Sequence, residues 1–550
     1  MKTEQKANYP LMEKYFARKT VALTGGTGFL GHGLIEKLLR CCPDVRKIIL
    51  LIRSKRNSNP EERLEALTKS SAFDTLREIN PKFAEKLSFV SCNLEADELG
   101  LAQKDQEMLQ DEVDIFVHGA ATLKFNEHLR LSFEINTKCV RKVLQLCKKM
   151  THLQSVVHIS TAYAYCNQEG TDEKFYDCGV DYNDLESSLR WMSDDVVTKV
   201  TPDLIGKRPN TYTLTKALAE DLIRRESGSL PICICRPSMI IPAIQEPSPG
   251  WCNNVYGPTA FVVAYQKGFM KAMMADLDII CDLIPLDYVV NGVLAAAMKT
   301  GTDFMDERRE RKSSTGSESD SDFFTDGVDS EKDFAPCPLD DAKRIIPIYT
   351  FNTGTQNPLV LHEIQAGLDH WLKEFPSKPI RLPSLSYHDN ELSYKINVLL
   401  HQTIPFHVMD AISGIMNKKQ RMVTINKKLQ AGMEVMRFFF TTSFRFGNEN
   451  ALNLLNCLHP DDKVTYNYDA RQFDWLNYMK CYVVGTQKYI LKEDNHSEHK
   501  KVIKRLKALN TFLNTSAVVG TLGLATSTGL TSTLFDMATY VWDTVGAVLV

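Results

Sequence analysis

A glycine-rich turn is the feature of this chain that most constrains its fold. The sequence TGGTGFLG covers residues 24–31, directly after the apolar run 20–23 and before the amphipathic segment 34–39. This order of strand, turn and helix is typical of a dinucleotide-binding βαβ unit. The alternative is a tight turn that binds no ligand. We predict cofactor contacts from residues of this turn: Thr24, Gly25, Thr27, Gly28, Phe29, Leu30 and Gly31.

The end of the second predicted strand, residues 47–52, indicates which cofactor is bound. Proteins that bind NAD usually carry an acid there for the ribose 2'-hydroxyl. This chain instead continues with Arg53, Ser54, Lys55 and Arg56. Cationic side chains pair with a 2'-phosphate, so the sequence favours NADP held by Arg53 and Lys55. The alternative is a solvated basic loop.

Further apolar runs continue the alternation of strands and helices, which predicts a doubly wound parallel sheet of the Rossmann type. They cover residues 87–90, 115–118, 155–159 and 232–235. Ligands bind at the carboxyl edge of such a sheet. That edge is expected to carry Ala120, Ala121, Ser160, Thr161 and Pro237, with Pro237 fixing the backbone beside the nicotinamide.

Tyr212 and Lys216 form a Tyr-x-x-x-Lys pair that suits proton transfer to a carbonyl oxygen during hydride transfer. A free tyrosine has a pKa of about 10, too high for efficient exchange near neutrality. Lys216 lies four residues on, on the same helical face, where its charge would stabilise a tyrosinate and its ammonium would reach the cofactor ribose. Thr161, with Ser160 beside it, would hold the substrate oxygen. Alone, such a pair is usually a solvated helix face, but after this turn and these strands it predicts an oxidoreductase.

These residues resemble the extended short-chain dehydrogenase/reductases. Longer stretches are similar to the animal alcohol-forming fatty acyl-CoA reductases: FNEHL at 125–129, HISTAYAYCN at 158–167, RPNTYTLTKALAE at 208–220, EPSPGW at 246–251 and GTQKYIL at 485–491. The resemblance covers about residues 12–300 and resumes near residue 345, through a second domain.

The resemblance implies reduction of a long-chain acyl-CoA by two NADPH, through an aldehyde, to a fatty alcohol. Tyr212 would be the proton donor, Lys216 its electrostatic partner and Thr161 the oxygen-positioning hydroxyl. Asn93 stands where these reductases often have an acid near the adenine, and its amide can still bind that base. The Pro-rich loop 246–258 is expected to wall an acyl tunnel, or else to be a surface loop.

Other functions are left open by the residues alone. A reductase could stop at the aldehyde, or use the same pair on a sugar-nucleotide or sterol. A nucleotide-binding scaffold without turnover is a third alternative. A net charge of −3 disfavours nucleic acid as a partner, and fourteen cysteines without disulfide or zinc spacing indicate a reducing compartment and no metal site.

Length predicts more than one domain. We expect an N-terminal extension at 1–17, a reductase domain at 18–375 and a mainly helical domain at 376–495, with a basic flank and tail at 496–550. Residues 306–340 are acidic and Ser-rich, which predicts a disordered insertion. Self-association is left open.

The uncharged run 508–535 follows a basic stretch at 500–507 and is long enough for a membrane helix. The positive flank suits the cytosolic side. The alternative is a helix packed on the second domain. The resemblance implies a membrane-associated protein facing the cytosol, on peroxisomes first and the endoplasmic reticulum second.

Overall fold

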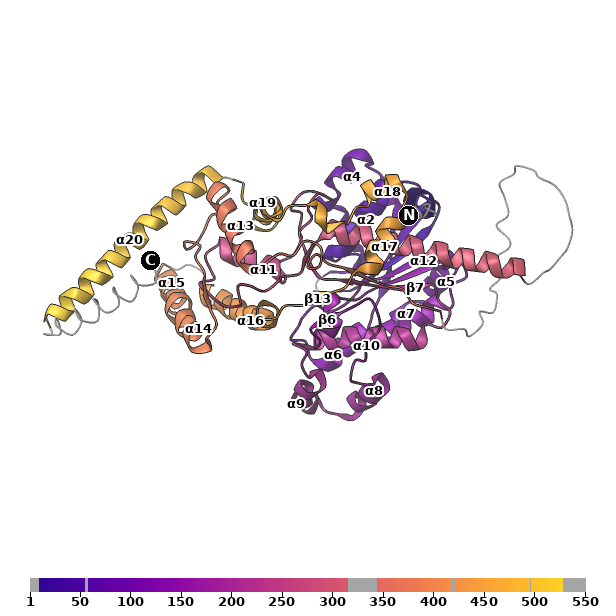
Figure 1. Cartoon of the computed structure of the whole chain (residues 1–550), viewed down its shortest axis with the longest axis horizontal. Helices are drawn as coiled ribbons and strands as arrows, with labels where there is room; N and C mark the ends of the chain where they lie inside the picture. Colours follow the sequence, from indigo (N-terminus) through magenta and orange to yellow (C-terminus); the bar gives the residue numbers. More distant parts are fainter. Residues whose placement is uncertain (1–8, 55–57, 315–343, 417–420, 495, 528–550) are drawn as a thin grey trace, which may run out of the picture.

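A parallel sheet forms the first half of the molecule, and a helical region adjoins it (Figure 1). The computed structural model describes residues 9–54, 58–314, 344–416, 421–494 and 496–527. The seven strands are ordered β11-β7-β5-β4-β1-β2-β3. Their bounds are β1 Thr20–Thr24, β2 Lys47–Arg53, β3 Leu87–Cys92, β4 Ile115–His118, β5 Ser155–Ile159, β7 Ile232–Pro237 and β11 Ile348–Phe351. The predicted parallel α/β sheet is therefore confirmed.

The strand order reverses between β1 and β4, which pair in parallel with Val21 opposite Ile115. In an open sheet a ligand crevice forms beyond the carboxyl ends at this switch point. Helices cover both faces. Their bounds are α1 Met12–Phe16, α2 Phe29–Cys41, α3 Pro60–Thr68, α4 Asp74–Ile79, α5 Gln103–Glu112, α6 Leu129–Phe133, α7 Cys139–Cys147, α8 Tyr182–Trp191, α9 Asp194–Ile205, α10 Thr211–Glu226 and α12 Leu286–Ser314.

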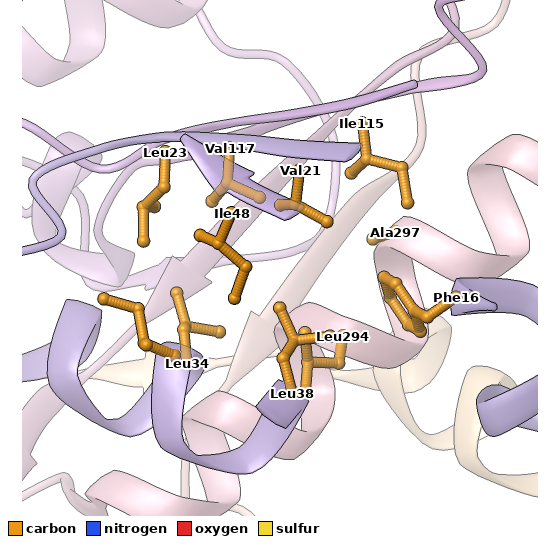
Figure 2. A pocket seen from close by; sticks show the side chains of 11 residues that line it. Phe16, Val21, Leu23, Leu34, Leu38, Ile48, Ile115, Val117, Leu294 and Ala297 are labelled. Atoms are coloured by element: carbon orange, nitrogen blue, oxygen red, sulfur yellow. The ribbon is translucent and has the colours of Figure 1, made fainter. Parts of the chain in front are cut away.

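Each side of the sheet has its own apolar core because successive side chains of a strand point to opposite faces. Val21 and Leu23 pack with α2 and α12, whereas Ala22 packs with α7 and α10. Figure 2 shows an apolar gap in the first core, lined by Phe16, Val21, Leu23, Leu34, Leu38, Ile48, Ile115, Val117, Leu294 and Ala297. These residues lie within the core and offer no polar group, so we regard the gap as a feature of core packing and not as a ligand site.

The helical region contains α11 Pro258–Gln266, α13 Leu361–Glu374, α14 Glu391–Val398, α15 Ile404–Ile415, α16 Met422–Phe440, α17 Glu449–Cys457, α18 Pro460–Thr465, α19 Trp475–Gly485 and α20 His496–Ser527. Short parallel strand pairs join it to the sheet region: β13 Arg445–Phe446 with β6 Gly170–Thr171, and β12 Ser386–His388 with β9 Ala272–Met274. A further pair links β10 Leu283–Pro285 with β8 Met239–Ile241. The mainly helical character predicted for this region is confirmed.

Residues 449–468 depart from the predicted domain boundary. In Figure 1, α17 and α18 lie beside α2 and α12 rather than with the other C-terminal helices. Leu454, Leu455 and Tyr466 belong to the same apolar cluster as Val21 and Leu34. This segment therefore completes the core of the first domain.

Two other expectations concern the ends of long helices. α12 runs to Ser314, so residues 306–314 are helical where we predicted disorder; residues 315–340 of that insertion lie outside the described part. The predicted membrane run 508–535 falls partly on α20 and partly on undescribed residues. Among the described helices, none has both the length and the apolar content needed to span a membrane.

Candidate active site

The glycine turn lies directly against the carboxyl end of β4. Gly25 has φ +79°, and a Cβ there would lie 2.8 Å from the carbonyl carbon of Gly119 and 2.9 Å from the nitrogen of Ala120. A Cβ on Gly31 would lie 2.5 Å from the carbonyl oxygens of Gly25 and Gly26. Both positions therefore require glycine.

The turn also leads into a helix N-terminus suited to an anion. α2 begins at Phe29, and its N-cap residue Gly28 is exposed and offers no capping side chain. The first N–H groups of a helix have no partner within the helix and attract phosphate. Phe29 and Leu30 are partly exposed beside them. The binding of a pyrophosphate at this helix end stays a prediction.

The side chain of Thr24 ties two strand ends together. Its hydroxyl oxygen accepts hydrogen bonds from the N–H groups of Gly119 and Ala120, both at 3.1 Å, and lies 2.8 Å from Nδ1 of His118. The hydroxyl proton is then free to point at that ring nitrogen. Burial, with repulsion from Lys216, lowers the pKa of His118 to about 3, so the ring is neutral and accepts this bond. Thr24 thus fixes the floor of the crevice.

A second arginine joins Arg53 at the end of β2. Arg63 on α3 donates hydrogen bonds to the carbonyl oxygen of Arg53 and to the hydroxyl of Thr27. Burial and the nearby Arg53 charge lower the pKa of Arg63. Among the described residues, no carboxylate forms an ion pair with either guanidinium. Lys55, which we predicted beside Arg53, lies outside the described residues.

Three residues predicted to contact the cofactor and one new residue lie along the same edge. Asn93 is exposed after β3, and its side-chain oxygen accepts the Glu95 N–H at 3.1 Å. Ala120 and Ala121 are partly exposed after β4. Asn136, in a π-helical turn at Glu134–Lys138, accepts the Thr122 N–H at 2.8 Å and donates to the Thr215 hydroxyl at 3.1 Å. It therefore ties the loop after β4 to α10; an asparagine within a predicted helix was the only signal in the sequence.

The predicted catalytic pair lies on the buried face of α10, which begins after the N-cap Asn210. Lys216 is 2% exposed, and its Nζ donates to the carbonyl oxygen of Ile159, the last residue of β5, at 2.7 Å. Tyr212 lies one turn earlier and packs its ring against Phe125, with centroids 5.6 Å apart. Burial raises the pKa of Tyr212 and lowers that of Lys216 to about 8. The phenol is therefore neutral and a weaker acid than free tyrosine, so the lowering of its pKa that we predicted from Lys216 is not seen in the described structure.

Thr161 lies at the carboxyl edge of the sheet, and its predicted role toward the substrate stays a prediction, whereas the side chain of Ser160 is used by the fold. Thr161 follows β5 by two residues; its hydroxyl accepts the Tyr163 N–H at 3.3 Å and lies 3.5 Å from the carbonyl oxygen of Pro237. Ser160 instead donates to Glu220, which forms a fully buried ion pair with Arg236. Its hydroxyl is therefore committed to the fold rather than to a substrate.

An apolar cavity lies where the sheet edge meets the helical region. Its volume is about 30 Å³, which leaves room for little more than a water molecule. Its lining comes from both halves of the chain: Tyr163, Met239, Pro258, Phe261, Val262, Ile280, Cys281, Asp282, Leu283, Leu361, Ile364, Phe439, Phe440, Phe444 and Tyr482. Phe125 links it to the catalytic pair, because this ring contacts both Tyr212 and Phe439, with centroids 5.6 and 6.0 Å away.

The Pro-rich loop 246–258 contributes less to this cavity than predicted. Trp251 is buried, stacks on Phe29 with centroids 5.5 Å apart, and donates from its indole nitrogen to the Ser71 hydroxyl at 3.2 Å. Of this loop, Pro258 alone lines the cavity. The loop therefore supports the cofactor turn. Within the described residues, no cluster of three or more His, Cys, Asp or Glu side chains is arranged to hold a metal ion.

Comparison with known proteins agrees with this architecture. Two family models described as Male sterility protein match residues 23–293 and 401–493. The terminal R domain of the myxalamid PKS-NRPS pathway is 17% identical, with 86% of this chain and 92% of that chain covered and a TM-score of 0.51. The reductase domain of a nonribosomal peptide synthetase from Mycobacterium tuberculosis is 18% identical, with 88% and 94% covered and a TM-score of 0.53. At these identities the likeness concerns the fold alone.

Sequence relatives are more specific. Fatty acyl-CoA reductase 1 of Mus musculus is 34% identical over 509 residues, covering 92% of both chains. The Gallus gallus protein of that name is 35% identical over the same coverage. Fatty acyl-CoA reductase 2 of Homo sapiens is 31% identical over 91% of both chains. The chain therefore belongs to the fatty acyl-CoA reductase family.

Proposed function

We propose that this protein reduces long-chain fatty acyl-CoA to fatty alcohol with two molecules of NADPH. One observation carries the proposal: the Tyr212–Lys216 pair at the end of β5 is linked through Phe125 to an apolar cavity lined by both halves of the chain. The apolar lining suits an aliphatic chain, which would have to push the lining side chains apart to enter, and its position would let the thioester lie beside the phenol.

The residues present fit each step. When bound, the nicotinamide supplies the hydride for both reductions. Addition of the first hydride to the thioester carbonyl carbon, with a proton from Tyr212 on the oxygen, forms a hemithioacetal; its C–S bond then breaks, coenzyme A leaves as the thiol and an aldehyde remains. Tyr212 then regains a proton from water, so that after addition of the second hydride to the aldehyde carbon it can protonate the alkoxide oxygen to the alcohol. Lys216 stabilises the tyrosinate left behind, and Thr161 orients the oxygen.

The direct test is a product assay with the full chain in detergent. Palmitoyl-CoA and NADPH are supplied, NADH is run in parallel, and products are identified by mass spectrometry. We expect hexadecanol with two NADPH consumed per alcohol. Aldehyde as the final product would support a two-electron reductase instead, and no turnover despite tight NADPH binding would contradict the acyl-CoA proposal.

We further propose that the Arg53–Arg63 pair binds the 2'-phosphate of NADPH. An Arg53→Ser/Arg63→Ser variant should raise KM for NADPH about 10- to 100-fold and leave KM for NADH nearly unchanged, since charge-assisted bonds to phosphate contribute about 1.5–3 kcal/mol. Lys82→Ser, which removes an exposed cation elsewhere on the same half of the sheet, should change neither constant. Equal losses with both cofactors would mean that the arginines only support the fold.

The lowered pKa of Lys216, about 8, predicts an alkaline limit on activity. The ammonium is lost as pH rises through this value, so kcat/KM should fall about tenfold per unit at higher pH. Because the unfolded chain would titrate near 10.4, burial of the charge costs stability at neutral pH, and this cost declines between pH 8 and about 10.4. Rate profiles and urea unfolding across this range measure both effects. A Lys216→Arg variant keeps its charge, so any activity that it retains should not show the decline; a decline unchanged in that variant would assign it to another group.

Location is also part of the proposal. We propose that the protein is associated with a membrane, peroxisomal first and endoplasmic reticulum second, with the active site in the cytosol. The basic stretch 500–507 and the uncharged run 508–535 support this arrangement. Fractionation of cells expressing the full chain, with protease protection of the sheet region as the readout, tests both the membrane and the side.

A further inference from the structure

The helices α14 and α15 expose an apolar face that nothing in the described part of the chain covers. They form one helical rod with the π-helical turn η6, Leu399–Thr403, between them. Every fourth residue along this rod is a large aliphatic side chain that is 46% to 68% exposed. We call this set the outer ladder: Leu392, Ile396, Leu400, Ile404, Val408, Ile412 and Met416. Leu399 and Ile415 widen it.

The opposite face of the rod is already occupied. Val398, Gln402, Phe406 and Asp410 are each no more than 8% exposed. The amide of Gln402 donates to Asn426 of α16 at 2.7 Å, and Phe406 meets the Phe269 ring edge to face, with centroids 6.1 Å apart. The rod therefore already packs on the protein through this face, and the outer ladder is the face that it leaves exposed. The rod contacts the protein through a mixed face, while its more apolar face has no partner in the described part of the chain.

Charge points to the identity of that partner. Between residues 392 and 421 the single acid is Asp410, and its carboxylate accepts the N–H groups of Arg421, Met422 and Val423 at the start of α16. The sequence after the rod contains Lys418 and Lys419. At the same end of the molecule (Figure 1), α20 carries exposed basic side chains, at Lys500, Lys501, Lys504, Arg505 and Lys507. Cations around an aliphatic face favour an anionic lipid surface.

We propose that the outer ladder seats the protein on a membrane, with the α14–α15 rod lying in the headgroup region. The ladder contains no aromatic side chain, whereas the centres of protein interfaces are enriched in Tyr, Trp and Phe. Exposed apolar faces of this extent mark interaction sites rather than ordinary surface. This seat is separate from the C-terminal tail and adds a second contact with the same lipid.

The seat brings lipid close to the cavity. α16 starts at Met422, just after the rod, and ends at Phe440, which lines the cavity beside Phe439. At about 1.5 Å per residue, this helix is about 27 Å long. An acyl chain leaving the bilayer, or an alcohol returning to it, would cross one helix length. This consequence rests on the proposed acyl-CoA reduction; the membrane contact itself does not.

Photocrosslinking identifies what covers the ladder. A photoreactive amino acid replaces Ile412 in the full chain, and Val464, 82% exposed on α18, is the matched control position. With vesicles of phosphatidylcholine and phosphatidylserine, we expect lipid adducts at position 412 and none at 464. A crosslinked dimer would assign the ladder to a second copy, and a crosslink to residues 528–550 would assign it to the chain's own tail. Either result, or no lipid adduct, would overturn the proposal.

A charge-insertion variant measures the contribution of the ladder. Val408→Glu with Ile412→Glu should weaken binding to the same vesicles at least about tenfold, because both side chains would leave the apolar layer. Val464→Glu should leave binding unchanged. NADPH-dependent reduction in detergent should be normal in both variants, which separates this proposal from that of the catalytic function. Unchanged vesicle binding would assign membrane affinity to other segments and contradict the seat.

Discussion

A Tyr212→Phe variant is expected to reduce acyl-CoA about 100- to 10,000-fold more slowly, with NADPH binding unchanged. The substitution removes one hydroxyl and keeps the ring that packs against Phe125. Its phenol is protonated at neutral pH even as a free side chain, and burial raises its pKa further. Steady-state rates give kcat, and quenching of protein fluorescence by NADPH gives the dissociation constant.

Tyr165→Phe is the matched control for this substitution. Tyr165 is also buried, and among the described residues its hydroxyl has no hydrogen-bond partner. Its loss should therefore leave kcat unchanged. If Tyr212→Phe kept more than about a tenth of the rate, the proton would come from another donor, and the role of Lys216 would have to be reassigned with it.

The largest loss of stability is expected from Glu220→Ala. Glu220 and Arg236 are 0% and 1% exposed, and the removal of one partner leaves the other charge buried and unpaired. The free energy of unfolding should fall by about 3–5 kcal/mol. Arg236 also donates to the carbonyl oxygens of Asp172 and Lys174, at 3.0 and 2.9 Å, and these bonds cannot neutralise a charge. Urea unfolding followed by circular dichroism measures the change.

The double variant Glu220→Leu/Arg236→Met provides the control. It removes both charges and keeps apolar volume, so it should be more stable than Glu220→Ala despite carrying one more substitution. Equal or greater loss in the double variant would show that the hydrogen bonds of Arg236 to the 172–174 loop matter more than the pairing of charges.

The sheet could be predicted from the sequence because its signals are local. Parallel strands buried on both faces appear as continuous apolar runs, and the predicted runs 20–23 and 155–159 correspond to β1 and β5. Gly25 and Gly31 could also be predicted, because a position where neighbouring backbone leaves no room for a Cβ must be glycine. Tyr212 and Lys216 share a helix face by spacing alone.

Features that depend on distant contacts could not be predicted. In the sequence, Arg63 cannot be told from any other arginine on an exposed helix. Its contact with Thr27 depends on the position of α3 over the end of β2. Ser160 and Thr161 are adjacent, but extended residues project to opposite sides, and no local pattern shows which side holds Glu220. The outer ladder was missed because large aliphatic residues at every fourth position predict a buried helix face, whatever surface covers that face.

The return of residues 449–468 to the sheet has a consequence for synthesis. Leu454 and Tyr466 complete the core around α1 and α2, and Asp462 accepts the Met12 N–H at 2.8 Å. A ribosome delivers Met12 and Asp462 about 450 residues apart. Synthesis proceeds at about 5–20 residues per second, so the N-terminal core stays incomplete for tens of seconds until residues 449–468 are made. During that interval the nascent chain displays an unfinished apolar surface, which makes it a natural client for chaperones that bind at the exit tunnel.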